Sequence, residues 1–156
     1  MNQEWSNNWY FNSSYSIHFL NQSIVSVIEN NFTFTGGAHG SAGINGLNFY
    51  ISPNYKLDFK DLFSYEDSQI VLEFISEYCF QELRTIYNEW MQTSEEEIKI
   101  QNKSMFWENS LDPDWENFDN FLISNENISF IFNQYQVSSY AFGMHIIDIP
   151  FKEFLN

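Results

Sequence analysis

One long amphipathic segment in the middle of the chain, with β-type sequence on both sides, constrains the fold most strongly. Ile70 and Phe74 begin a series of apolar residues at helical spacing that continues to Trp90. Glutamates occupy the opposite side of the same helical projection, which is typical of a face exposed to water. With Ser64 as the expected N-cap, the pattern predicts a helix over residues 64–91.

Short segments of alternating apolar and polar residues on either side of this helix predict strands. They are residues 15–20, 24–34, 44–51, 54–59, 118–123, 128–132 and 144–149. Strands, then one helix, then further strands are typical of an α+β fold with an antiparallel sheet. We expect one sheet of about five or six strands with the long helix on one face, in a single domain over residues 1–156.

The composition excludes several classes of protein. Hydrophobic residues make up 44% of the chain and aromatic residues 20%. The chain therefore has enough apolar surface to form a core and is not intrinsically disordered. Its one cysteine, Cys79, excludes an internal disulfide and a multi-cysteine zinc site. Because Cys79 lies on the apolar side of the helix, we expect it to be a small buried hydrophobe rather than a nucleophile.

The net charge restricts the partners of the protein. The chain has 6 Lys and Arg residues against 21 Asp and Glu residues, which gives a formal net charge of −15. Nucleic acids and anionic membranes are disfavoured, because both are bound through clustered basic residues. Charge favours a cationic partner, either a basic protein or a metal ion, or serves only to keep an aromatic-rich chain in solution.

The sequence contains no apolar run near the ~18 residues of a membrane span. Residues 1–5 lack the basic start and apolar stretch of a secretory signal. We therefore expect an extracytoplasmic protein if a signal or anchor has been removed, and a cytoplasmic protein otherwise. The oligomeric state is left open.

Two segments far apart in the chain carry a family resemblance. The first is FTGGAHG at residues 34–40, followed after a strand by LDFKDLF at residues 57–63. The second is NQYQVSSYAFG at residues 133–143, which leads into the last strand. Their order and spacing, with the long helix between them, resemble the two hallmarks of the RsiV-like extracytoplasmic domain family. The resemblance extends from about Ile24 to Leu155.

This resemblance implies an α+β fold and a cell-envelope setting. The family includes the sensor domain of a lysozyme-responsive anti-sigma factor and a domain attached to a peptidoglycan deacetylase. In at least one branch it therefore implies non-catalytic recognition of lysozyme, a strongly basic protein whose charge complements this acidic chain. The chain departs from the family pattern at Gln134 and Ser139, which replace prolines, and at Gln136, which replaces an acid.

The two hallmark segments supply the candidate binding residues. Four of the six glycines lie in residues 35–43, which indicates a loop with special backbone dihedrals. The second segment supplies large aromatic side chains, which either contact a partner or pack on the core. We expect the two loops to lie side by side at one end of the sheet as a recognition surface. The candidate residues are Gly36, Gly37, His39, Ser41, Tyr135, Tyr140 and Phe142.

Catalytic and metal sites find little support in the sequence. His39 has Ser41, Asp58 and Asp61 nearby in the chain, but they form no recognised catalytic spacing. The three histidines lack the spacing of metal ligands, and the acids of residues 112–116 fit a solvated turn better than a calcium loop. We expect no metal, no cofactor and no catalytic residues, although the sequence leaves enzymatic activity open.

The resulting hypothesis is a non-catalytic binding module for a basic protein partner, such as a lysozyme-like muramidase at the cell envelope. One alternative is an accessory or catalytic domain of peptidoglycan or carbohydrate modification, in which the aromatic residues stack on sugars. Another is an immunity-like cytoplasmic protein.

Overall fold

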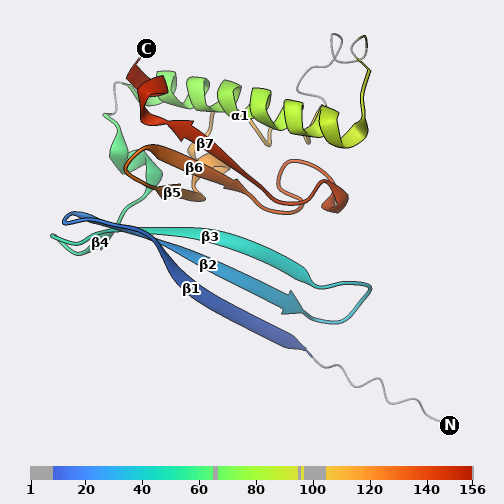
Figure 1. Ribbon diagram of the computed structural model, residues 1–156, viewed down its shortest axis with the longest axis horizontal. Coiled ribbons are helices and arrows are strands. Elements are labelled where there is room, and N and C mark those ends of the chain that lie inside the picture. Colours follow the sequence, from blue (N-terminus) through green and yellow to red (C-terminus); the bar gives the residue numbers. More distant parts are fainter. Residues whose placement is uncertain (1–8, 65–66, 95, 97–104, 156) are drawn as a thin grey trace.

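The computed structural model describes residues 9–64, 67–94, 96 and 105–155, so the N-terminal segment considered above lies outside the described residues. Two antiparallel sheets and one long helix, α1 (Ser68–Met91), form the fold (Figure 1). Sheet A has the order β1-β2-β3-β4, with strands Tyr10–Leu20, Ile24–Phe34, Ser41–Tyr50 and Tyr55–Lys56. Sheet B has the order β5-β6-β7, with strands Phe121–Ile123, Asn127–Phe132 and His145–Pro150. Short 3₁₀ helices are Phe59–Leu62, Trp115–Phe118, Tyr140–Phe142 and Phe151–Leu155.

The core lies between α1 and sheet B (Figure 1). Ile75, Cys79 and Leu83 place the apolar stripe of α1 in this core, and each is 0% exposed. Phe130 and Ile149 face them from sheet B and are equally inaccessible to water. Burial of such side chains contributes about 1.5–3 kcal/mol each, so this layer supplies much of the stability of the fold. Within the described ranges, no helix is long and apolar enough to cross a membrane.

The α+β class is confirmed, but the expectation of one sheet is wrong in detail, because the strands divide into sheets of four and three. The helix begins at Ser68, with Asp67 at the N-cap position, rather than at Ser64. Ser64 instead closes the preceding turn, where its hydroxyl accepts from the backbone N–H of Asp67 at 3.3 Å and donates to the Asp67 carboxylate at 2.5 Å. These side-chain hydrogen bonds between Ser64 and Asp67 stabilise a turn, so the helix begins four residues later than the sequence predicted.

Asparagine side chains join the two sheets where backbone pairing stops. The Asn120 amide accepts from the Gly46 N–H and donates to the Ile44 carbonyl, both at 2.8 Å. The Asn133 amide accepts from the Ile44 N–H at 2.9 Å and donates to the same carbonyl at 3.0 Å. These two side chains give β3 the hydrogen bonds that a neighbouring strand would otherwise supply.

A buried polar network continues this junction. The Ser26 hydroxyl donates to the Asn48 side-chain carbonyl at 2.6 Å, and the Asn48 amide donates to the Phe121 carbonyl at 2.8 Å. The Ile123 N–H donates to the Ser26 hydroxyl at 3.2 Å. Ser26 and Asn48 are 0% and 1% exposed, so each polar atom in the network depends on its partner rather than on water.

The close approach of β3 to β5 requires glycine at position 46. A Cβ atom on Gly46 would lie 1.8 Å from the Phe121 carbonyl oxygen, a backbone atom that cannot rotate away. We expect Gly46→Ala to lower the free energy of unfolding by about 3 kcal/mol or more, because the sheets must separate. Thermal unfolding followed by circular dichroism measures the loss.

Gly43→Ala is the matched control in the same strand. Its Cβ would meet only the end of the Asn31 side chain, at 2.9 Å, and that side chain can move. The control should change the free energy of unfolding by less than about 1 kcal/mol. Equal losses in the two variants would contradict the assigned role of Gly46.

Candidate functional site

The two loops singled out in the sequence lie against each other. The His39 ring, in the loop between β2 and β3, stacks on the Tyr140 ring with centroids 4.2 Å apart and planes at 28°. Tyr140 belongs to the segment between β6 and β7. The loops meet across two different sheets, because Asn133 at the start of the second segment binds Ile44 just beyond the first loop.

This contact is part of a longer line of rings. Tyr140 packs on Tyr135 with ring centroids 5.5 Å apart, and Tyr135 stacks on Trp107 at 6.1 Å with planes at 23°. Tyr135 and Trp107 are 49% and 47% exposed, and His39 is also exposed. We call His39, Tyr140, Tyr135 and Trp107 the aromatic row.

Sequence reasoning missed Trp107, because it lies in an irregular segment outside both hallmark segments. Its backbone N–H donates to the Val137 carbonyl at 3.0 Å, which ties residues 105–112 to the second hallmark segment. The one available signal was a tryptophan in a polar, irregular segment, a residue type that is enriched in binding hot spots.

Unusual backbone angles occur in both loops. Gly36 and Gly37 have φ values of 98° and 106°, which side-chain-bearing residues rarely adopt. Tyr135 also has a positive φ, 66°, although it is not glycine. Such a conformation costs energy at a tyrosine and persists where the surroundings impose it. The ring contacts of Tyr135 with Trp107 and Tyr140 belong to these surroundings.

Besides the two glycines, two of the candidate residues lie outside the aromatic row. Phe142 is only 5% exposed and packs on Tyr87, Trp90 and Phe106. The prediction that Phe142 contacts a partner is therefore corrected, because its ring belongs to the core beneath the row. Ser41 is exposed, begins β3 and pairs with Thr33 of β2.

The surroundings of His39 do not form a catalytic arrangement. Its Nδ1 is 2.9 Å from the Gly40 carbonyl oxygen, and its ring is stacked on Tyr140. Asp58 follows β4, which pairs with the far end of β3. Ten residues of strand separate the two ends by roughly 30 Å, so Asp58 and Asp61 cannot orient this histidine.

No metal-binding cluster of three or more His, Cys, Asp or Glu residues occurs in the described part of the chain. His145, below the row, lies with its Nε2 2.9 Å from the Phe142 carbonyl oxygen, and burial lowers its pKa from 6.5. A neutral imidazole with this hydrogen bond is a structural support for the second segment.

Acidic groups lie beside one end of the aromatic row. Trp107 lines a hollow of about 540 Å³ together with Glu108 and Asp112, whose side chains are exposed. Asn117 holds the rim of this hollow, because its amide donates to the carbonyls of Asn109 and Asp112. The row therefore combines aromatic rings with negative charge.

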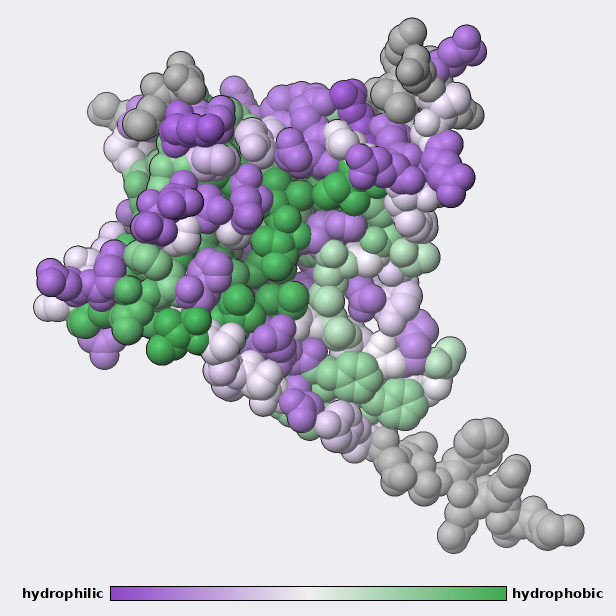
Figure 2. All heavy atoms as spheres, in the orientation of Figure 1, coloured by the Kyte–Doolittle hydropathy of each residue, from purple (hydrophilic) through white to green (hydrophobic). Residues whose placement is uncertain are grey.

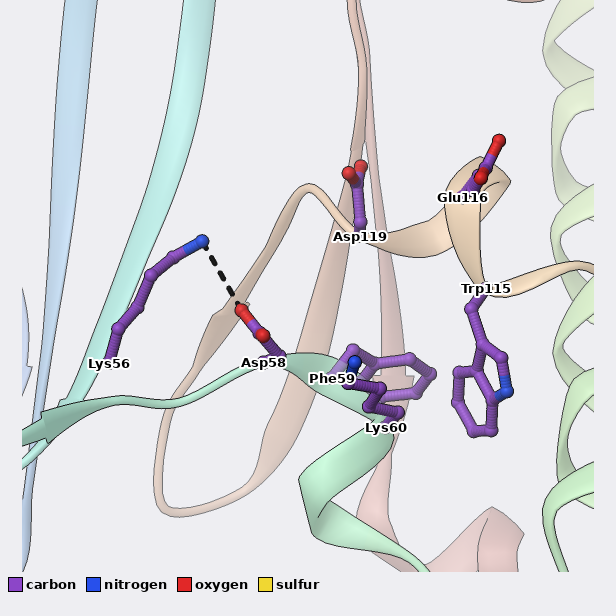
Figure 3. Close-up of a pocket in the computed structure, with 7 residues that line it drawn as sticks. All are labelled: Lys56, Asp58, Phe59, Lys60, Trp115, Glu116 and Asp119. Atoms are coloured by element: carbon purple, nitrogen blue, oxygen red, sulfur yellow. Dashed lines mark ion pairs between the residues drawn. The ribbon is translucent and has the colours of Figure 1, made fainter.

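A second hollow of about 210 Å³ lies next to β4, near the opposite end of β3 (Figure 3). Lys56 forms an ion pair there with Asp58 at 3.2 Å, and Lys60 and Asp119 also line it. Glu116 lines it as well, so three carboxylates stand with two lysines here, whereas the hollow at Trp107 has Glu108 and Asp112 and no basic residue among the described residues that line it. The hollow at Trp107 therefore favours a cationic partner more strongly.

Residues 60–152 match the DUF3298 family, described as a protein of unknown function, and the chain belongs to this family. A DUF3298 family crystal structure from Bacteroides fragilis aligns with a TM-score of 0.67 and 19% identity, over 95% of this chain and 53% of that chain. A DUF3298 protein from Pseudomonas aeruginosa aligns with a TM-score of 0.61 and 13% identity, over 94% and 61% of the two chains. The chain thus spans only part of the length of these structures, which share its fold. No curated protein matches it.

The one cysteine supplies no nucleophile to the site. Cys79 is 0% exposed in the core, and burial raises the pKa of its thiol. We expect the folded protein to resist thiol-specific reagents at pH 8, because the thiolate that reacts is both disfavoured and inaccessible. Reaction should become stoichiometric in denaturant. Rapid labelling of the folded protein, measured by intact mass, would contradict this assignment.

Proposed function

We propose that this protein is a non-catalytic binding module that recognises a basic protein partner through the aromatic row. The observation that carries the proposal is the row itself, since it combines residues from three separate parts of the chain into one exposed surface. Tyrosine and tryptophan are enriched among residues that dominate binding energy, and they lose little conformational entropy on binding.

Charge supports a basic partner for this surface. The ring faces of Trp107 and Tyr135 attract guanidinium and ammonium groups, and Glu108 and Asp112 stand beside Trp107. The net charge of −15 also accelerates encounter with a cationic protein and disfavours acidic competitors. Because the stacked rings already restrict one another, they lose less conformational entropy on binding. This smaller entropic cost favours affinity.

Among basic proteins, we propose a lysozyme-like muramidase in a cell-envelope setting. The support is the resemblance of the two hallmark segments to a family in which one branch senses lysozyme. Both segments contribute rings to the row, His39 from the first and Tyr135 and Tyr140 from the second.

A calorimetric titration with c-type lysozyme tests the proposal. We expect saturable 1:1 binding that weakens as salt rises, because complementary charge contributes to it. Cytochrome c, which is basic but is not a muramidase, distinguishes recognition of lysozyme from attraction to any cation. Equal binding of both would support a basic partner without the lysozyme assignment, and no binding of either at low salt would overturn the proposal.

Substitutions in the row separate binding from stability. Trp107→Ala and Tyr140→Ala should each weaken binding by about 1–3 kcal/mol, roughly a tenfold to hundredfold rise in Kd. Because these rings are partly exposed, the melting temperature should fall only slightly. Trp9→Ala is the matched control, since Trp9 is 72% exposed and lies outside the row. If the two row variants lose stability but keep affinity, the row is a structural lock between loops rather than a binding surface.

A further inference from the structure

Strand β1 presents an open edge, a feature that the aromatic row does not involve. It is the outermost strand of sheet A, and within the described residues only β2 pairs with it (Figure 1). The strand is 11 residues long and pairs with β2 in unbroken register from Tyr10 to Ile17, before a bulge at His18. Its outer backbone groups therefore form a template for another strand.

This edge lacks the features that normally prevent strand pairing. Natural edge strands are often protected by charged residues or proline. Residues 5–28 contain no Asp, Glu, Lys, Arg or Pro, although 17% of the whole chain is charged. The strand itself therefore carries no charge, and the carboxylate beside it is that of Glu29 in β2, which accepts from the hydroxyls of Ser13 and Tyr15.

Apolar side chains on one face of β1 are unusually accessible. Phe11, Tyr15 and Ile17 are 68%, 63% and 65% exposed, and all three project from the face of sheet A opposite the buried Ser26. In Figure 2 a few green, hydrophobic residues lie among white and purple ones along the lower edge of the molecule, where Figure 1 places β1. A strand paired at the edge would place its own side chains beside these three on the same face, where cross-strand contacts form.

We propose that β1 pairs antiparallel with β1 of a second copy of this chain, around a two-fold axis at Ser14. The strand is self-complementary about this residue. Phe11 of one copy then lies opposite Ile17 of the other on one face, and Asn12 lies opposite Ser16 on the other face. The apolar pair of Phe11 with Ile17 and the polar pair of Asn12 with Ser16 are of the kind that stabilises cross-strand pairing, and Tyr15 lies opposite Ser13 between them. The two copies share one continuous sheet.

The charge of the protein gives this dimer a distinctive dependence on salt. Each copy carries −15, so the bodies of the two subunits repel each other while the neutral strands pair. Added salt screens this repulsion and strengthens the dimer. Binding of a basic partner has the opposite dependence, because salt weakens it. An experiment can therefore contradict the dimer without contradicting the proposed function, and the reverse.

Sedimentation equilibrium of the purified protein tests the proposal. We expect a monomer–dimer equilibrium at micromolar concentrations that shifts towards dimer between low and high salt. A protein that stays monomeric at all concentrations and salts overturns the proposal and leaves the edge to a different partner.

Substitutions at the axis identify the pairing strand. Ser14 is exposed beside a hollow of about 270 Å³, so Ser14→Lys fits in the monomer but places two ammonium groups opposite each other in the dimer. We expect it to raise the dimer Kd roughly tenfold, although it lowers the net negative charge. Thr85→Lys on the exposed side of α1 makes the same charge change and should not weaken the dimer.

Mixing two variants gives the decisive control. Ser14→Glu alone should also weaken the dimer, whereas an equimolar mixture of Ser14→Lys and Ser14→Glu should restore it, because opposite charges then face each other at the axis. Circular dichroism establishes that both variants are folded. A dimer unaffected by Ser14→Lys, or a mixture that stays monomeric, overturns pairing through β1.

Discussion

The hydrogen-bonded junction between the two sheets is the interaction on which the arrangement of the rest depends. Ser26 and Asn48 carry polar groups from sheet A into the interior, where they bind the backbone of β5. A buried donor or acceptor that loses its partner costs about 1–3 kcal/mol, so the sheets are held in one register rather than sliding over an apolar contact. Gly46 makes this possible because it removes the side chain that would separate β3 from β5.

The same junction positions the candidate binding surface. Asn133 binds Ile44 and so brings the second hallmark segment to the end of β3 where the glycine-rich loop lies. His39 and Tyr140 then stack, and Tyr135 and Trp107 extend the row. Tyr140 shares a short 3₁₀ helix with Phe142, whose ring is buried in the core and contacts His145, so this part of the second segment is anchored to the core.

The local pattern of apolar and polar residues predicted several of the strands and the helix. The strand at 24–34 follows from hydrophobic periodicity and is confirmed. The predicted apolar stripe of the helix is only partly correct, because Ile70 and Trp90 at its two ends are 70% and 45% exposed. The buried face is centred on Ile75, Cys79 and Leu83 instead. The start of the helix was displaced to Ser68, because a serine and an acid three residues apart stabilise a turn as readily as a helix N-terminus. For Phe142 the sequence left exposure and burial open, since a loop phenylalanine has no periodic pattern to assign its side.

The sequence by itself determined the α+β class, the acidic surface, the long helix and the uncharged β1, because composition and periodicity depend only on residues close together in the chain. Tertiary structure decided the division into two sheets, the place of Trp107 in the row and the distance between His39 and Asp58. These depend on contacts such as Asn120 with Gly46 and Asn133 with Ile44, between residues more than seventy positions apart. An asparagine whose side chain makes the hydrogen bonds of a neighbouring strand cannot be distinguished in sequence from any other loop asparagine. Only the folded chain therefore reveals which backbone groups it binds.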